Sequence, residues 1–130
     1  MNRKLSDKEL ISKISASLPE GAEQSVCTCG GLEGLISRLP KESEIEEISF
    51  VFRALADEKR IKILSMLKIQ PLCVCIIRGL LDISDSRLSY HLSILKKAGL
   101  ITGEQKGTWI TYSLTQKGKK WLSSAKNNMD

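Results

Sequence analysis

Residues 71–100, PLCVCIIRGLLDISDSRLSYHLSILKKAGL, join a pair of cysteines to a segment with a helical period and a polar outer face. Pro71 suits the first turn of a helix, Ser84 can cap a second helix, and Gly99 can end it. The apolar residues expected to face inward recur at helical spacing: Leu72, Ile76 and Leu80, then Leu88, Leu92 and Leu95. Two helices joined by a short turn predict a helix-turn-helix.

The residues that follow predict a β-hairpin and a final helix. From residue 101 to 114 the apolar period changes to two, around a basic turn at Gln105-Lys106-Gly107. Residues 115–126 return to a helical pattern, with Trp121 on the apolar side. The expected fold is therefore mainly α with a small β-hairpin.

Two further helices are expected before residue 71. Ser43 and Glu46 have the spacing of a capping box, and Asp57 can cap the next helix. The first of these helices carries an apolar stripe that we expect to lie in the core: Ile45, Ile48, Phe52 and Leu55. We expect residues 44–126 to form one domain that ends in a C-terminal helix.

Residues 1–43 form a separate N-terminal segment. Ser6 and Glu9 predict a capped amphipathic helix, whose apolar stripe could serve a dimer interface or pack on its own core. Residues 19–31 have no period and contain three glycines, so we expect a mobile connector. This connector carries Cys27 and Cys29.

Charge and composition limit the class of protein. The net charge is +5, and residues 84–126 hold eight basic and two acidic side chains, whereas residues 1–83 hold twelve of each. Such a basic sector favours a polyanion partner, with DNA or RNA foremost. No apolar stretch is long enough to cross a bilayer or to resemble a secretory signal, so we expect a cytoplasmic protein without membrane contact.

The outer face of the helix after Ser84 is the candidate DNA-reading surface. Short hydroxyls and an Arg suit contacts with base edges and phosphates, and this face offers Ser86, Arg87, Ser89 and Tyr90. Lys96, Lys97 and Lys106 would add attraction to the DNA backbone. The alternative for a polar face alone is an ordinary solvated surface. For His91, the only histidine, a structural or DNA-contacting role is favoured over metal binding.

The four cysteines form two C-x-C pairs, Cys27 with Cys29 and Cys73 with Cys75. Soft thiolates select Zn, Cd, Pb or related ions, although structural zinc usually has C-x-x-C spacing. Residues two apart on a regular helix lie on different faces, so metal binding at Cys73 and Cys75 should reshape the start of their helix. Small buried hydrophobes are the alternative role for these two cysteines.

Four ordered segments resemble the ArsR/SmtB family of metalloregulatory repressors: Phe52–Leu64, Leu72–Cys75, Ser86–Ile101 and Trp109–Tyr112. The resemblance implies a homodimeric winged helix-turn-helix repressor that binds double-stranded operator DNA when metal-free and releases it when metal binds. Residues 44–126 would then be its DNA-binding domain with a C-terminal dimerisation helix. The L-C-V-C segment looks like the site of the arsenic-responsive and the cadmium/lead-responsive (CadC-type) sensors. Cysteines in an N-terminal arm make the second type the closer likeness.

The chain also departs from that family pattern. Its arm has C-x-C spacing, and Ile76 stands where an aspartate commonly follows the second helix cysteine. A second family site, with Asp and His on the C-terminal helix, is rejected because this chain has no histidine there. The effector that the resemblance implies is a soft metal ion (Cd, Pb, Zn or As(III)), held by Cys73, Cys75, Cys27 and Cys29.

Three other functions remain as alternatives. Oxidation of the paired cysteines could drive DNA release in place of metal, or structural zinc could support a constitutive DNA-binding module. An enzyme such as a small thiol reductase lacks support, since the chain has neither C-x-x-C nor a Gly-rich phosphate loop. We therefore expect a regulator and not an enzyme.

Overall fold

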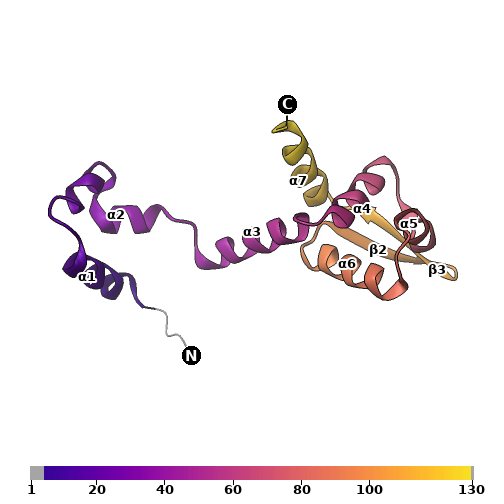
Figure 1. Ribbon diagram of the computed structural model, residues 1–130, viewed down its shortest axis with the longest axis horizontal. Helices are drawn as coiled ribbons and strands as arrows, with labels where there is room; N and C mark the ends of the chain where they lie inside the picture. Colours follow the sequence, from indigo (N-terminus) through magenta and orange to yellow (C-terminus); the bar gives the residue numbers. More distant parts are fainter. Residues whose placement is uncertain (1–4, 130) are drawn as a thin grey trace. The chain divides into compact units, whose positions relative to one another are not determined.

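The computed structural model describes residues 5–129, with the side chain of Cys27 outside the described part (Figure 1). The chain forms two compact units, which divide between Glu42 and Ser43. Among the described residues, no helix combines the length and the apolar content that a bilayer crossing requires.

The N-terminal unit contains α1 (Asp7–Ser17), the 3₁₀ helix η1 (Glu23–Cys29) and α2 (Gly31–Arg38). The capping box expected at α1 is confirmed: Ser6 Oγ accepts from the Glu9 backbone N–H at 3.2 Å, and Glu9 Oε2 accepts from the Ser6 N–H at 3.3 Å. The segment expected to be a mobile connector contains η1 over most of its length. Its three-residue turns do not show in a search for a 3.6 period.

The C-terminal unit begins with α3 (Glu42–Leu55) and α4 (Glu58–Ile69). The Asp57 cap of α4 is confirmed, since its Oδ1 accepts from the N–H groups of Lys59 and Arg60 at 2.9 and 3.2 Å. The expected cap at Ser43 is wrong, because Ser43 already lies inside α3. The core face of α3 also differs from the prediction: Val51 and Ala54 are buried, while Ile45, Ile48 and Phe52 are exposed.

The helix-turn-helix consists of α5 (Val74–Leu81) and α6 (Asp85–Lys97). Pro71 is not in the first turn of α5, because the two residues between Pro71 and this helix form a short strand, β1 (Leu72–Cys73). The inward face of α5 is therefore made by Ile77 and Leu81, and Ile76 and Leu80 are exposed. The predicted cap of α6 is confirmed: Ser84 Oγ accepts from the Arg87 N–H at 3.3 Å. The helix terminator is also confirmed, since Gly99 has a φ of 75°.

The predicted hairpin is present as β2 (Ile101–Lys106) and β3 (Trp109–Leu114). The two strands are antiparallel, and Lys106 pairs with Trp109, so the turn lies one residue later than expected, at Gly107 and Thr108. Gly107 has a φ of 62°, a conformation that favours glycine. The sheet has the order β1-β3-β2, because β1 pairs with the outer edge of β3.

One aliphatic core joins the elements of the C-terminal unit. Its side chains come from α3 to α7 and from both hairpin strands, and Ile63, Leu64, Ile77, Leu95 and Leu100 are fully buried. The last helix, α7 (Gln116–Asn127), buries Leu122 in this core and is capped by Thr115. This packing holds α6 against the hairpin in the C-terminal unit, where Figure 1 shows both in orange tones.

Candidate DNA-binding face and thiol site

The predicted DNA-reading residues of α6 share an exposed surface. Ser86, Arg87, Ser89 and Tyr90 are all exposed, and Tyr90 keeps 61% of its surface accessible. Leu88, Leu92 and Leu95 hold the opposite face of α6 in the core. This helix can therefore present two hydroxyls, a guanidinium and a phenol to a DNA groove, which are groups that contact base edges and phosphates.

His91 does not belong to this exposed face. Its side chain is only 5% exposed, and its Nδ1 lies 3.0 Å from Nη1 of Arg60, a buried residue of α4. The prediction that His91 contacts DNA is thus corrected, because the imidazole faces the interior and is held by Arg60. The structure supports the structural role that was the other alternative.

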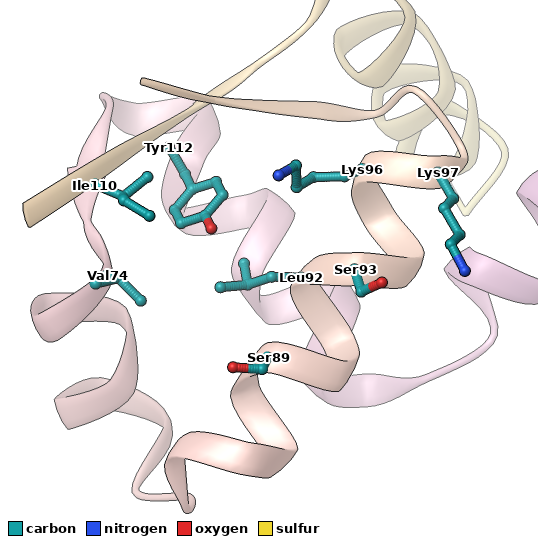
Figure 2. Close-up of a pocket in the computed structure, with 8 residues that line it drawn as sticks. All are labelled: Val74, Ser89, Leu92, Ser93, Lys96, Lys97, Ile110 and Tyr112. Atoms are coloured by element: carbon teal, nitrogen blue, oxygen red, sulfur yellow. The ribbon is translucent and has the colours of Figure 1, made fainter. Parts of the chain in front are cut away.

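A groove of about 460 Å³ lies between α6 and the hairpin. Figure 2 shows the side chains of Val74, Leu92 and Tyr112 converging on this space, with Ser89, Ser93 and Lys96 along α6. The Ser89 hydroxyl and the Lys96 ammonium group thus border an apolar floor, and Lys97 belongs to the same lining with its ammonium group directed away from that floor. Sequence reasoning missed the floor, because Val74, Ile110 and Tyr112 come from segments separated in the chain and only the sheet brings them together.

The tip of the hairpin carries Lys106, as predicted. Lys106 ends β2 and is exposed, and its strand partner Trp109 keeps 53% of its surface accessible. A cation and a large aromatic therefore share the end of the hairpin. Both suit contacts with a nucleic-acid backbone and its sugars.

The thiols of Cys73 and Cys75 are brought together by the start of α5. Their Sγ atoms lie 2.6 Å apart, and both side chains are accessible to solvent. The expectation that these thiols diverge is wrong, because Cys73 is not inside the helix. It is the N-cap of α5, with extended dihedrals (φ −73°, ψ 153°), and its Sγ can turn toward the first helical turn.

The two thiols differ in acidity. A hydrogen bond from the Cys75 thiol, assisted by the backbone N–H of Ile76, lowers the pKa of Cys73. The same hydrogen bond raises the pKa of Cys75, because its proton is shared with the Cys73 sulfur. Cys73 is therefore the thiol that ionises first and the better nucleophile or ligand of the pair.

The Cys73 and Cys75 pair fits two of the ligands of a thiophilic metal ion. Two thiolates bound at about 2.3 Å to one tetrahedral zinc lie roughly 3.7 Å apart, a separation within reach of these neighbouring sulfurs. Among the side chains that the structure describes, no three or more Cys, His, Asp or Glu groups gather as a metal site. The pair by itself thus offers two thiolates to an ion.

The other predicted ligands lie in the N-terminal unit. Cys29 is partly buried at the end of η1, and its Sγ contacts the carbonyl of Val26 at 3.1 Å. The prediction for the side chain of Cys27 falls outside the described part of the chain. Gly34 of α2 packs so closely on the Cys29 carbonyl that a Cβ there would collide with it.

Comparisons with known sequences agree on one family. Residues 57–102 match the profile described as "Bacterial regulatory protein, arsR family". The chain is 45% identical to the "Arsenical resistance operon repressor" of Bacillus subtilis (strain 168) over 74 residues. This stretch covers 56% of this chain and 70% of that protein. It is 34% identical over 77 residues to the "Cadmium resistance transcriptional regulatory protein CadC homolog" of Staphylococcus aureus, covering 58% of this chain and 64% of the relative.

A solved structure shows the same fold. The homodimeric winged helix-turn-helix DNA-binding domain Mb0332 of Mycobacterium bovis superimposes with a TM-score of 0.64, covering 72% of this chain and 90% of that chain, at 21% identity. The fold of the C-terminal unit is therefore a winged helix-turn-helix, with α6 as the recognition helix and the β2–β3 hairpin as the wing.

Proposed function

The chain belongs to the ArsR family of bacterial regulatory proteins, and we propose that it is a repressor that binds operator DNA when metal-free and releases it when a soft metal ion binds its thiols. Members of this family are transcriptional regulators and not enzymes, which agrees with the expectation from the sequence. The relatives named for arsenical and cadmium resistance support a thiophilic effector. Cd, Pb, Zn and As(III) are the candidates.

The DNA-binding surface combines α6, the groove and the wing. Ser86, Arg87, Ser89 and Tyr90 enter the major groove, while Lys96 and Lys106 approach the phosphates on either side. The groove between α6 and β3 takes the DNA backbone, because Ser89 and Ser93 can donate hydrogen bonds where Lys96 and Lys97 supply positive charge. The concave shape lets one strand pass between the recognition helix and the wing.

A second copy of the chain completes the DNA-binding unit. Ile45, Ile48 and Phe52 form an exposed apolar stripe along α3, and Phe52 stacks edge-on against Trp121 of α7, with ring centroids 5.1 Å apart. Such a stripe on a regulator of this fold suits a homodimer interface. The dimer then sets two α6 helices about one DNA turn, roughly 34 Å, apart on a pseudo-palindromic site.

The convergence of Cys73 and Cys75 at the start of the helix-turn-helix carries the proposed metal response. These residues supply two thiolates to the effector, and Cys29 and Cys27 supply the others, from the same chain or from its partner. A soft metal ion binds thiolates strongly. Its binding to these cysteines therefore stabilises a conformation of the chain other than the one that binds DNA. A hundredfold loss of operator affinity requires a coupling of only about 3 kcal/mol.

The direct test is operator affinity measured with and without Cd(II), Pb(II), Zn(II) and As(III) in reductant. We expect at least one of these to weaken binding about a hundredfold, which corresponds to the usual upper range of allosteric coupling. Cys73→Ser should bind DNA as the wild type does and lose the metal response. Metal-induced release that survives in Cys73→Ser would refute the proposed sensor site.

Thiol oxidation is the second candidate function, because the Sγ atoms of Cys73 and Cys75 already lie 2.6 Å apart. In this case loss of two electrons and two protons to a peroxide would form the Cys73–Cys75 disulfide and release DNA. Treatment with hydrogen peroxide in the absence of metal separates the two functions. Structural zinc would instead show itself as unfolding when metal is removed by a chelator.

A further inference from the structure

Val74 lies between the two cysteines in the chain and also belongs to the lining of the groove. In the chain it separates Cys73 from Cys75, and in the fold it begins α5 and lines the groove that faces α6 and β3 (Figure 2). Its side chain is half-buried and packs against the hydrophobic core. A displacement of the backbone between the two thiols therefore moves a wall of the groove.

The strand β1 strengthens this connection. Cys73 pairs with Thr111 and Leu72 pairs with Tyr112, so the backbone next to Val74 is hydrogen-bonded to the strand that carries the other wall. Tyr112 and Ile110 face Val74 across the same space, and Leu92 of α6 closes it. The thiol pair, the wing strand and the recognition helix thus meet around one side chain.

We propose that Val74 transmits effector capture at Cys73 and Cys75 to the groove between the recognition helix and the wing. The inference deepens the proposed function and rests on it. To hold one ion, both thiolates must turn toward it and give up their present mutual contact, and this rotates the backbone on both sides of Val74. Because a β-branched side chain has restricted χ1 freedom, the isopropyl group follows its backbone and does not adjust by changing rotamer.

The consequence is a change in the spacing of α6 and β3. An isopropyl group that moves into or out of the groove either pushes Leu92 and Tyr112 apart or leaves them without support, since packed interiors respond to displacements of one methylene. Both changes alter the fit of a DNA strand between the recognition helix and the wing. No separate movement of the whole α5 helix is needed.

Val74→Ala tests this coupling, with Ile76→Ala as the matched control. Ile76 is the same distance from Cys75 along the chain, is also β-branched, and is 46% exposed away from the groove lining. Cd(II) binding is followed by thiolate-to-metal absorption, and operator affinity is measured with and without Cd(II). We expect both variants to bind Cd(II) with the thiolate-to-metal absorption of the wild type. The ratio of operator affinity without Cd(II) to that with Cd(II) should fall from about a hundred to below about ten in Val74→Ala alone, whatever the metal-free affinity of this variant.

Full wild-type release in Val74→Ala would overturn the inference. Val74→Thr should keep the response, because it preserves the branching at Cβ. If Val74→Ala does not fold, the amide signals of Thr111 and Tyr112 in the wild type still decide the question. Cd(II) must shift these signals in the absence of DNA, and unchanged signals would refute the coupling.

The same measurement separates this inference from the proposed function. If Cd(II) shifts Thr111 and Tyr112 in the wild type and Val74→Ala abolishes the shifts, the coupling stands even where operator affinity does not change, and only the repressor function fails. If Cd(II) releases DNA without these shifts, the repressor function stands and the route through Val74 is wrong.

Discussion

Arg60 and His91 meet in the interior of the C-terminal unit, where Nη1 of the guanidinium lies 3.0 Å from Nδ1 of the imidazole. Arg60 also donates from Nε to the Ala54 carbonyl at 2.7 Å and from Nη2 to the Arg53 carbonyl at 3.2 Å. One side chain of α4 thus binds the end of α3 and the middle of the recognition helix. Since Arg60 only donates, Nδ1 of His91 must be unprotonated to accept.

The Arg60–His91 contact predicts a loss of stability in mild acid. Burial lowers the pKa of His91 below its ordinary value of 6.5. The negative charge of Asp57 opposes this shift, and the positive charges of Arg60, Arg87 and Lys59 add to it. The unfolded chain therefore binds this proton more readily. The contribution of His91 is fully present above pH 6.5 and is lost as the pH falls from 6.5 toward the lower folded-state pKa.

Urea unfolding between pH 7.5 and 5.5 measures this effect, because His91 is the only histidine. His91→Asn is the control, since its Oδ1 can accept from Arg60 and does not titrate. We expect the free energy of unfolding of the wild type to decrease over this range relative to that of His91→Asn. Parallel profiles for the two proteins would contradict the assignment.

Replacement of Arg60 should destabilise the fold strongly. Arg60→Met keeps the aliphatic volume but removes the donor of Arg60 to the Ala54 carbonyl, the donor to the imidazole nitrogen and one of the two donors to the Arg53 carbonyl. This should cost about 3 kcal/mol. The exposed Lys62 of the same helix provides the control, and Lys62→Met should change stability by less than about 0.5 kcal/mol. Chemical denaturation of both variants measures the difference. Equal effects would show that the Arg60 contacts add nothing.

Gly118 should tolerate no side chain. A Cβ at this buried position of α7 would collide with the Leu100 carbonyl and with Cδ1 of Leu114. We expect Gly118→Ala to lower the free energy of unfolding by about 2 kcal/mol, a typical effect of overpacking. Gly79→Ala is the matched control in α5, where a Cβ meets nothing within 4 Å, and it should stabilise by up to about 1 kcal/mol. A thermal shift of opposite sign in the two variants is the expected readout.

The exposed stripe of α3 should control dimer formation. Ile48 is 42% exposed in the single chain, and Ile48→Glu places a charge in the proposed interface. Sedimentation velocity should show a monomer, and operator affinity should fall at least about a hundredfold because the second half-site is no longer tethered. Ile69→Glu is the control, because Ile69 is 83% exposed outside this stripe. A dimeric Ile48→Glu protein would exclude α3 from the interface.

The wing lysine should contribute affinity without sequence preference. Removal of one phosphate contact lowers the slope of log affinity against log salt by about 1, so Lys106→Ala in a dimer should lower it by about 2. Arg87→Ala should, in addition, reduce the discrimination between operator and random DNA. Fluorescence anisotropy titrations at several salt concentrations distinguish the two effects. An unchanged slope for Lys106→Ala would remove the wing tip from the DNA contact.

Local signals in the sequence were sufficient for much of the fold. The caps at Ser6, Asp57 and Ser84 and the terminator at Gly99 depend on hydrogen bonds and dihedrals within a few residues, and each occurs as predicted. The change of period at residue 101 likewise identified the hairpin. Such features need no knowledge of distant contacts, because the interacting groups are close along the chain.

Periodicity was not sufficient to choose which apolar face is buried. On α3 and α5 two apolar stripes compete, and Ile48, Phe52, Ile76 and Leu80 are exposed where the pattern predicted burial. The selection depends on which partner helix or strand covers each face. A face reserved for a second copy of the chain has the same composition as a core face.

The sequence by itself determined the two helices of the helix-turn-helix, the polar face of α6 and the pairing of the cysteines as C-x-C. Only the tertiary structure decided that His91 faces inward onto Arg60 and that Val74 lies opposite Tyr112. It also decided that β1 includes Cys73, so that α5 begins after this residue and its thiol lies beside that of Cys75. These outcomes depend on contacts between residues far apart in the chain. Backbone pairing and burial, and not local propensity, set their geometry.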